Sequence, residues 1–230
     1  GNIINPILSL ADPDVYSIPM ILMIGWRGEP GLTDEPQHKK QGRITLNLLE
    51  TMEIPYIILD GENNENLEDN VNNIINDAGK NKRPVAIVVK KNSFEIYNSK
   101  KEEKLKYSMT REDAIKSIVD QISDKDIVVS TTGVTSRELF EYRESKKQSH
   151  RNDFYTVGGM GHANQIALGI AMQNKSKNIL CLDGDGALIM HMGSAAIIGQ
   201  QKCNNFKHIL FNNGCHDSVG GQPTVGYKIN

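Results

Sequence analysis

The stretch NILCLDGDGA, residues 178–187, decides the fold of this chain. Its first half is a short apolar run that ends at Asp and Gly, which predicts a buried strand. A second apolar run, HILF at 208–211, precedes NNGC at 212–215, and residues 188–201 between the two runs are long and apolar enough for a helix. The order strand, glycine-rich turn, helix and strand predicts a parallel α/β unit.

Polar groups stand where both predicted strands end, and ligands of open parallel sheets collect beyond the carboxyl ends of strands. Asp185 offers an anionic oxygen there, and Asn212 or Asn213 offers a neutral amide oxygen. Mg²⁺ takes such oxygens, with phosphate and water completing its shell. Gly184 and Gly186 let the backbone approach a diphosphate, and the next helix can point N–H groups at it. We therefore expect a site for a metal and a diphosphate.

The composition is that of an ordinary globular protein: 230 residues, 38% hydrophobic and 23% charged, with a net charge of -2. This balance favours neither nucleic acid nor a membrane surface as a partner. No apolar run approaches the roughly 20 residues of a membrane helix. The three cysteines, Cys181, Cys203 and Cys215, form no CxxC pair. We expect a cytoplasmic protein without a disulfide framework.

Strands and helices alternate along the whole chain, which predicts an α/β fold with two parallel-sheet domains. We expect the domains at residues 1–92 and 108–230, joined by a polar linker at 93–107. Both ends read as cut, so a longer native protein is expected. Further predicted strands span 18–24, 56–59, 85–89 and 127–129, and further predicted helices span 1–10, 39–52, 66–78, 110–122, 134–143 and 162–173.

Three other groups of residues are candidates for the site. The turn TTGVTSR at 131–137, with Thr131, Gly133 and Ser136, offers N–H and O–H donors to a diphosphate, or simply caps a helix. His216 directly follows the metal segment and can move a proton, or it is a loop histidine without a role. Arg27 and His38 suit a dianionic substrate head, or are surface charges beside a turn. The other histidines, His150, His191 and His208, show no partner at ligand spacing, and His191 is expected in the helix that follows the metal segment.

Together these stretches resemble a known family. GDG, then twenty-five residues, then NN is similar to the cofactor fingerprint of thiamine-diphosphate (ThDP) enzymes. The stretches GWRGEPG at 25–31 and DEPQH at 34–38 resemble the branch of ThDP 2-oxo acid decarboxylases that act on phosphonopyruvate or sulfopyruvate. The resemblance covers nearly the whole chain, and it implies a pyrimidine-binding domain followed by a diphosphate-binding domain, both of the ThDP-binding fold and both truncated here.

The resemblance also implies residue roles. The Mg²⁺ ligands would be Asp185, Asn213 and the backbone oxygen of Cys215, with Asn212 a substitute because the spacing carries one extra residue. Met160 would bend the cofactor, while the Gly158 carbonyl and the Met160 amide hold its pyrimidine ring. The remaining cofactor-binding residues would be Thr131, Gly133, Ser136, Gly184, Gly186 and Ala187, and the catalytic residues His216, Arg27 and His38.

The implied reaction is the decarboxylation of 3-phosphonopyruvate, a small 2-oxo acid with an anionic head, to phosphonoacetaldehyde and CO₂, as part of phosphonate biosynthesis. The active site would lie between subunits, so at least a dimer is implied. In the family a Glu of the first domain hydrogen-bonds the aminopyrimidine. Glu29, Glu35 and Glu50 stand in other contexts, so this Glu is expected before Gly1.

The alternatives are a sulfopyruvate decarboxylase and a non-catalytic fragment that keeps only the ThDP fold. A carboligase would need a middle domain. A flavodoxin-like phosphatase with Asp185 as its nucleophile would have no use for Asn213 or Met160.

Overall fold

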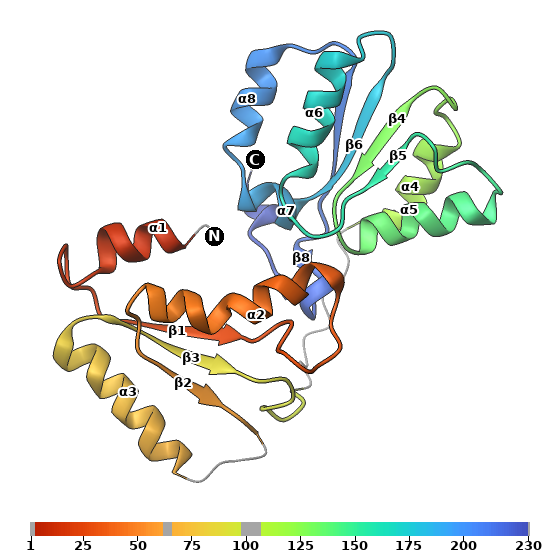
Figure 1. Ribbon diagram of the computed structural model, residues 1–230. Helices are drawn as coiled ribbons and strands as arrows, with labels where there is room; N and C mark the ends of the chain where they lie inside the picture. Colours follow the sequence, from red (N-terminus) through yellow and green to blue (C-terminus); the bar gives the residue numbers. More distant parts are fainter. Residues whose placement is uncertain (1–2, 62–65, 98–106, 230) are drawn as a thin grey trace. The chain divides into compact units, whose positions relative to one another are not determined.

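The computed structural model describes residues 3–61, 66–97 and 107–229. It divides the chain into two compact units, Gly1–Glu102 and Glu103–Asn230, each built on a parallel sheet (Figure 1). Most of the expected linker, residues 98–106, lies outside the described residues. Among the helices described, none combines the length and the apolar character needed to cross a membrane.

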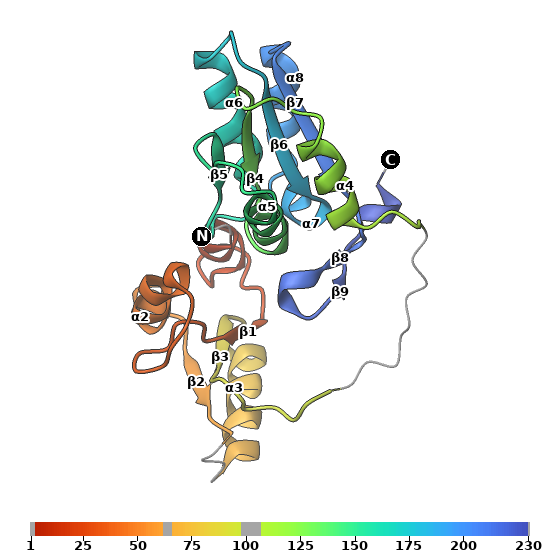
Figure 2. The same cartoon turned by 90° about the vertical axis from the view of Figure 1, so that its right-hand side faces the viewer.

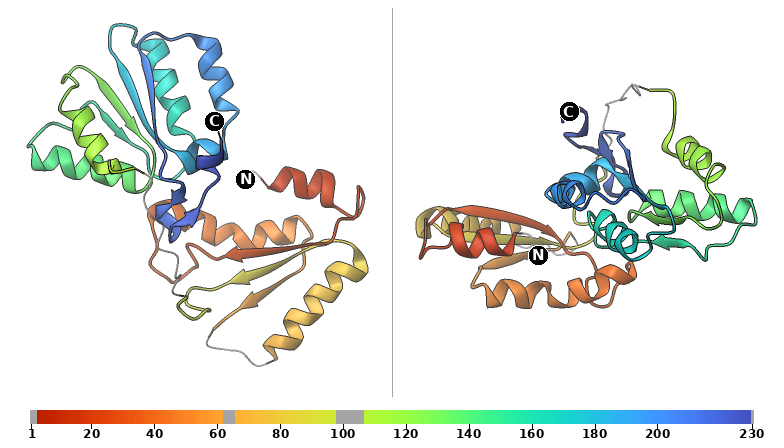
Figure 3. Two further views of the ribbon diagram at one scale, coloured as in Figure 1. Left: turned by 180° about the vertical axis from the view of Figure 1, so that it is seen from behind. Right: turned by 90° about the horizontal axis from the view of Figure 1, so that it is seen from above.

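Unit 1 is a three-stranded parallel sheet in the order β1-β3-β2. The central strand β3 is buried along its whole length, which explains its continuous apolar sequence PVAIVV. Helix α3 packs on one face through Ile74 and Ala78, and η1 and α2 cover the other through Ile7 and Leu49 (Figures 1 and 3). The elements are α1 (Ile4–Pro6), the π-helix η1 (Ile7–Ala11), β1 (Met20–Gly25), α2 (Pro36–Thr51), β2 (Tyr56–Leu59), α3 (Leu67–Asn81) and β3 (Pro84–Val89).

Unit 2 holds a four-stranded parallel sheet in the order β5-β4-β6-β7 and a small antiparallel pair, β8 and β9. Its elements are α4 (Arg111–Val119), β4 (Ile127–Ser130), α5 (Val134–Ser145), β5 (Asp153–Tyr155), α6 (Ala163–Gln173), β6 (Ile179–Gly184), α7 (Asp185–Met190), α8 (Ser194–Gln201), β7 (Phe206–Phe211), β8 (Cys215–His216), the 3₁₀ turn η2 (Asp217–Val219), β9 (Gln222–Pro223) and the 3₁₀ turn η3 (Gly226–Lys228).

Helices cover both faces of the unit 2 sheet (Figure 2). On one face, α6 packs through Ala163, Ala167 and Ala171 against β4 and β6, with α8 beside it. The small alanine side chains let the backbone of α6 approach β4 and β6 closely, so the helix packs directly on the sheet. On the other face, α4 and α5 pack through Ile115 and Leu139.

The predicted strands and helices are confirmed apart from their ends, with one exception. The helix expected over 188–201 is wrong as a single helix: the chain forms α7 and α8, separated by residues 191–193. Gly193 weakens the helix at that point. His191 leaves the helical conformation (φ -137°, ψ 43°) and turns its ring against the ring of His162, at 4.3 Å between centroids.

The strand order of unit 2 indicates where a ligand would bind. After β4 the chain adds β5 on one side and then crosses to add β6 on the other side of β4. The order therefore reverses between β4 and β6, and ligands of such sheets bind at the carboxyl ends of the two strands that flank the reversal. The segments at those ends are Thr131–Gly133 and Gly184–Asp185.

Candidate functional site

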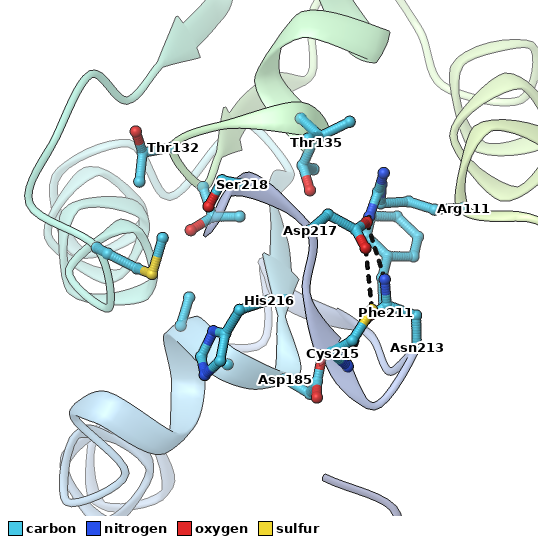
Figure 4. Close-up of a pocket in the computed structure, with 16 residues that line it drawn as sticks. Arg111, Thr132, Thr135, Asp185, Phe211, Asn213, Cys215, His216, Asp217 and Ser218 are labelled. Atoms are coloured by element: carbon cyan, nitrogen blue, oxygen red, sulfur yellow. Dashed lines mark hydrogen bonds and ion pairs between the residues drawn. The ribbon is translucent and has the colours of Figure 1, made fainter. Parts of the chain in front are cut away.

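A cavity of about 60 Å³ lies at this reversal point in unit 2 (Figure 4). It brings together most of the residues expected at a metal and diphosphate site, although they come from segments far apart in sequence. The expected residues that line it are Thr131, Met160, Gly184, Asp185, Gly186, Ala187, Asn213, Cys215 and His216. Gly133, Ser136 and Gly158 are not among its lining residues.

The turn after β4 presents one unused hydroxyl. Thr131 is 4% exposed, and its Oγ1 has no hydrogen-bond partner in the part of the chain that the structure describes. Ser136 braces the turn from behind, because its Oγ donates to the Thr131 carbonyl (2.7 Å) and contacts Ser130 Oγ (2.8 Å). Thr132 Oγ1 accepts the Gly158 N–H (3.0 Å), which joins this turn to the Met160 segment. A buried hydroxyl without a partner is costly, so Thr131 is a donor prepared for a ligand.

Asp185 is the first residue of α7 and only 4% exposed. Its Oδ2 accepts a hydrogen bond from Thr224 Oγ1. A side-chain carbon at Gly226 would lie 2.5 Å from Asp185 Oδ2 and 2.7 Å from Asn212 Oδ1. The Asp185 and Asn212 oxygens therefore both lie close beside Gly226, which only a glycine permits, and oxygens of this kind are the ligands that a hard divalent cation prefers.

The two asparagines after β7 face different ways. The Asn212 amide donates to the Gly226 carbonyl (2.9 Å), which directs it toward Asp185. The Asn213 amide donates to Asp217 Oδ2 (2.9 Å), and its oxygen accepts the Cys215 N–H (3.2 Å). Asn213 lines the cavity with Asp185, but in this arrangement Asn212 supplies the oxygen nearer the space beside Gly226.

Arg111 and Asp217 also line the cavity, although no sequence pattern predicts them there (Figure 4). Arg111 donates to Asp217 Oδ2 (2.6 Å) and makes a two-pronged pair with Glu138 (2.8 and 2.9 Å). The hydrogen bonds to Glu138 and then to Asp217 raise the pKa of Arg111 against the effect of its burial. Burial alone would raise the pKa of Asp217, but hydrogen bonds from Cys215, Arg111 and Asn213 lower it. A fixed cation therefore stands at the rim of the cavity.

His216 covers the first turn of α7. A side chain at Gly186 would collide with the His216 ring, so the glycine is what lets the imidazole lie there. In Figure 4 His216 and Asp185 lie on one side of the cavity, away from Arg111. The ring is thus held beside the residues expected to bind a diphosphate.

The segment before α6 is shaped by glycines with positive φ, Gly158 (+71°), Gly159 (+56°) and Gly161 (+88°). At Gly161 a side-chain carbon would lie 2.5 Å from the His191 ring and 2.8 Å from the Ala187 carbonyl. The segment therefore packs tightly on the start and end of α7, and it places Met160 at the cavity.

A cover segment, residues 214–223, keeps the cavity small. Its Ser218 lies near the turn after β4, where a side-chain carbon at Gly133 would be 3.6 Å from Ser218 Cβ. Ligand pockets usually hold about 300 Å³ or more.

Arg27 and His38 belong to unit 1, where both contact Asp34. Arg27 donates to the two oxygens of Asp34 (2.9 and 2.6 Å), and His38 Nδ1 lies 3.0 Å from Oδ1. These bonds, from Arg27 first and then from His38, lower the pKa of Asp34 strongly. Arg27 also lines a cavity of about 610 Å³ at the carboxyl ends of β1 and β3, together with Glu29 and Lys90. The structure therefore brings Arg27 and His38 together as expected. Their common partner in the chain is the carboxylate of Asp34.

Unit 2 carries a thiamine-diphosphate-binding domain, since its parallel α/β fold agrees with a match of its sequence to that domain. Residues 131–230 match the sequence profile of the family described as thiamine pyrophosphate enzyme, C-terminal TPP binding domain. The residues of the cavity fit this cofactor, since the unpaired Thr131 hydroxyl suits a diphosphate and the side-chain oxygens of Asp185 and Asn213 suit its metal.

Over its whole length the chain is similar to curated ThDP-dependent decarboxylases. It is 32% identical over its whole length to a phosphonopyruvate decarboxylase of Streptomyces viridochromogenes and 30% identical to that of Streptomyces hygroscopicus. It spans 59% of the length of each of these relatives. The chain is also 35% identical to the sulfopyruvate decarboxylase subunit beta of Methanocaldococcus jannaschii. That match covers 50% of this chain and 57% of the relative.

Proposed function

We propose that the protein decarboxylates 3-phosphonopyruvate to phosphonoacetaldehyde and CO₂ with ThDP and Mg²⁺. The observation that carries this proposal is the cavity in which Thr131, Asp185 and Asn213 meet from three neighbouring strand ends. The substrate is argued from the names of the two Streptomyces relatives, which are similar to this chain over its whole length.

In this proposal Asp185, Asn213 and the Cys215 carbonyl bind Mg²⁺, with Asn212 the alternative amide. The hydroxyl of Thr131 donates to the diphosphate, and Ser136 acts by fixing the Thr131 carbonyl. The N–H groups of Gly186 and Ala187 lie in the first turn of α7, where helical amides have no partner within the helix and are free for a phosphate oxygen. Gly133 and Gly184 allow the backbone to approach the cofactor.

ThDP, when bound, supplies the electron sink that decarboxylation of a 2-oxo acid requires. The chain's own residues position it: Met160 supports the bend of the cofactor, and Gly158 and Met160 offer backbone groups to the pyrimidine. His216, held over Gly186, can donate a proton or hydrogen-bond a carboxylate. The Arg27 side chain is 57% exposed, so it can bind a phosphonate oxygen while it keeps its ion pair with Asp34. His38 contacts the same carboxylate and lies beside it.

We further propose that unit 1 binds the pyrimidine and unit 2 the diphosphate, and that a second copy completes each site, so the protein acts as a dimer or larger assembly. An anionic 2-oxo acid is then its small-molecule partner. Asp185 is a poor candidate for a phosphatase nucleophile, because its carboxylate is buried and bonded to Thr224.

Calorimetry with ThDP in the presence and absence of Mg²⁺ tests cofactor binding, and steady-state release of CO₂ tests turnover. We expect tight ThDP binding only when Mg²⁺ is present. The absence of binding would contradict the proposal and favour a fold that has lost catalysis.

A sulfopyruvate decarboxylase is the second candidate, because the archaeal subunit beta matches half of the chain. Both substrate heads are tetrahedral anions, but the phosphonate can carry a second negative charge. The ratio of kcat/KM for the two acids separates the candidates. A ratio that favours sulfopyruvate would replace the first candidate with the second.

A further inference from the structure

Asp183 is a buried carboxylate that the proposed chemistry does not use. It lies in β6 with no exposed surface, after the apolar residues Ile179 to Leu182. Its oxygens accept hydrogen bonds from the Gly184 N–H (3.0 Å), His208 Nε2 (3.0 Å) and Asn164 Nδ2 (3.4 Å). A buried charge is costly even with such donors, and an apolar side chain would often be as stable there. The acid therefore suggests a task other than packing.

The three donors come from, or directly adjoin, three of the segments that line the cavity. Gly184 immediately precedes Asp185. His208 lies in β7, opposite Cys181 of β6, and β7 leads to Asn212 and Asn213. Asn164 lies in the first turn of α6, directly after the segment that carries Met160. His208 has no predicted partner at ligand spacing in the sequence, but the register of β6 and β7 sets it beside Asp183.

We propose that Asp183 is a positioning residue that holds the Gly184–Asp185 turn, the start of α6 and the end of β7 in the arrangement that binds cofactor. The inference rests on the proposed function, because the positioned groups are the proposed ligands. Asp183 acts through these segments and does not touch the cofactor. Partners behind the direct ligands of a metal commonly set its affinity in this way.

The same side chains also invite a metal interpretation, which the contacts disfavour. Ligand atoms of Cys181, Asp183 and His208 lie within 4.8 Å of one another. The Asp183 oxygens, however, already accept three N–H donors. Burial, and then the charge of Asp183, raise the pKa of the Cys181 thiol, which keeps it protonated and a weak ligand.

The test compares Asp183→Ala with Asp153→Ala in the full chain. Asp153 is an equally buried carboxylate (1% exposed) paired with Arg143, but it begins β5 and so lies at the amino end of the same sheet, away from the cavity. Both variants lose a buried carboxylate, so both should lose stability. Only Asp183→Ala should weaken Mg²⁺-dependent ThDP binding, by about tenfold or more in calorimetry. Asp183→Asn should recover only part of that loss, since its amide oxygen can still accept the Gly184 N–H but its NH₂ group cannot accept from His208 and Asn164.

Amide hydrogen exchange of Gly184 in the cofactor-free protein gives a second readout. It should quicken in Asp183→Ala and stay unchanged in Asp153→Ala. If Asp183→Ala does not fold, His208→Leu removes one donor at a partly exposed position and should weaken ThDP binding in the same direction.

Equal ThDP affinity in Asp183→Ala and the parent protein, or equal losses in both alanine variants, would overturn the inference. A parent protein that binds no ThDP would instead refute the proposed function. In that case unchanged Gly184 exchange in Asp183→Ala would overturn the positioning role, and faster exchange would support it.

Discussion

Replacing Thr131 by valine should raise stability and lower cofactor affinity together. In the free protein Thr131 Oγ1 is buried and unpaired, and leaving a hydroxyl in that state costs about 1–3 kcal/mol. Valine has nearly the same shape and needs no partner. The free energy of unfolding should therefore rise by about 1 kcal/mol, which raises Tm by about 2–8 °C for domains in this size range.

Binding should change in the opposite direction. A hydroxyl that donates to a charged diphosphate contributes about 1.5–3 kcal/mol. Its loss should weaken ThDP affinity by about tenfold to a hundredfold. Differential scanning calorimetry of the cofactor-free protein measures the first effect, and titration with ThDP and Mg²⁺ measures the second.

Thr156→Val is the matched control. Thr156 Oγ1 is also buried and unpaired within the described residues, but Thr156 does not line the cavity. The control should gain stability and keep its affinity. A lower Tm for Thr131→Val, an unchanged ThDP affinity, or an equal loss of affinity in Thr156→Val would refute the assignment of this hydroxyl.

Three further predictions concern other parts of the chain. Asp185→Ala should abolish the Mg²⁺ dependence of ThDP binding, measured by titration with and without the metal; retained dependence would exclude Asp185 as a ligand. Thr110→Ala removes the capping box that Thr110 forms with Asp113 at the start of α4 and should lower the free energy of unfolding by about 1 kcal/mol in urea; no change would mean that the cap is not formed in solution. Burial raises the pKa of Asp77, but hydrogen bonds from Arg83 and Asn81 lower it on balance. Its contribution to stability is therefore complete above the unfolded-state pKa of about 3.9 and is lost as the pH falls through the lower folded value. In Asp77→Asn the free energy of unfolding should therefore fall less steeply as the pH is lowered below about 4. The same pH dependence in the variant and the parent protein would contradict this.

Local pattern was sufficient for the parts of the site that lie on single segments. The apolar run before LDGDG predicts β6, and the rule that ligands gather at strand ends places Asp185 correctly at a cavity. The glycines at 184 and 186 signal a close approach, although the structure shows that at Gly186 the approaching group is the His216 ring. These inferences need only residues that are near one another in sequence.

Contacts between distant segments could not be predicted from that pattern. Arg111 and Asp217 are 106 positions apart, and no local signal joins them. The pairing of His208 with Asp183 depends on the register of β6 and β7, which a sequence alone leaves open. The break between α7 and α8 follows from packing of His191 against Gly161, a tertiary contact that overrides the helical pattern of residues 188–201.

Two of these distant contacts involve proposed metal ligands. They come from Asp217 in the cover segment and from Thr224, which directly follows it. Thr224 bonds the Asp185 carboxylate, and Asp217 bonds the Asn213 amide, so two proposed metal ligands already have partners within the chain. Arg111 holds Asp217 in turn (2.6 Å). Under the proposed function the metal would replace these internal bonds, and its apparent affinity would fall with the fraction of molecules in which they are broken.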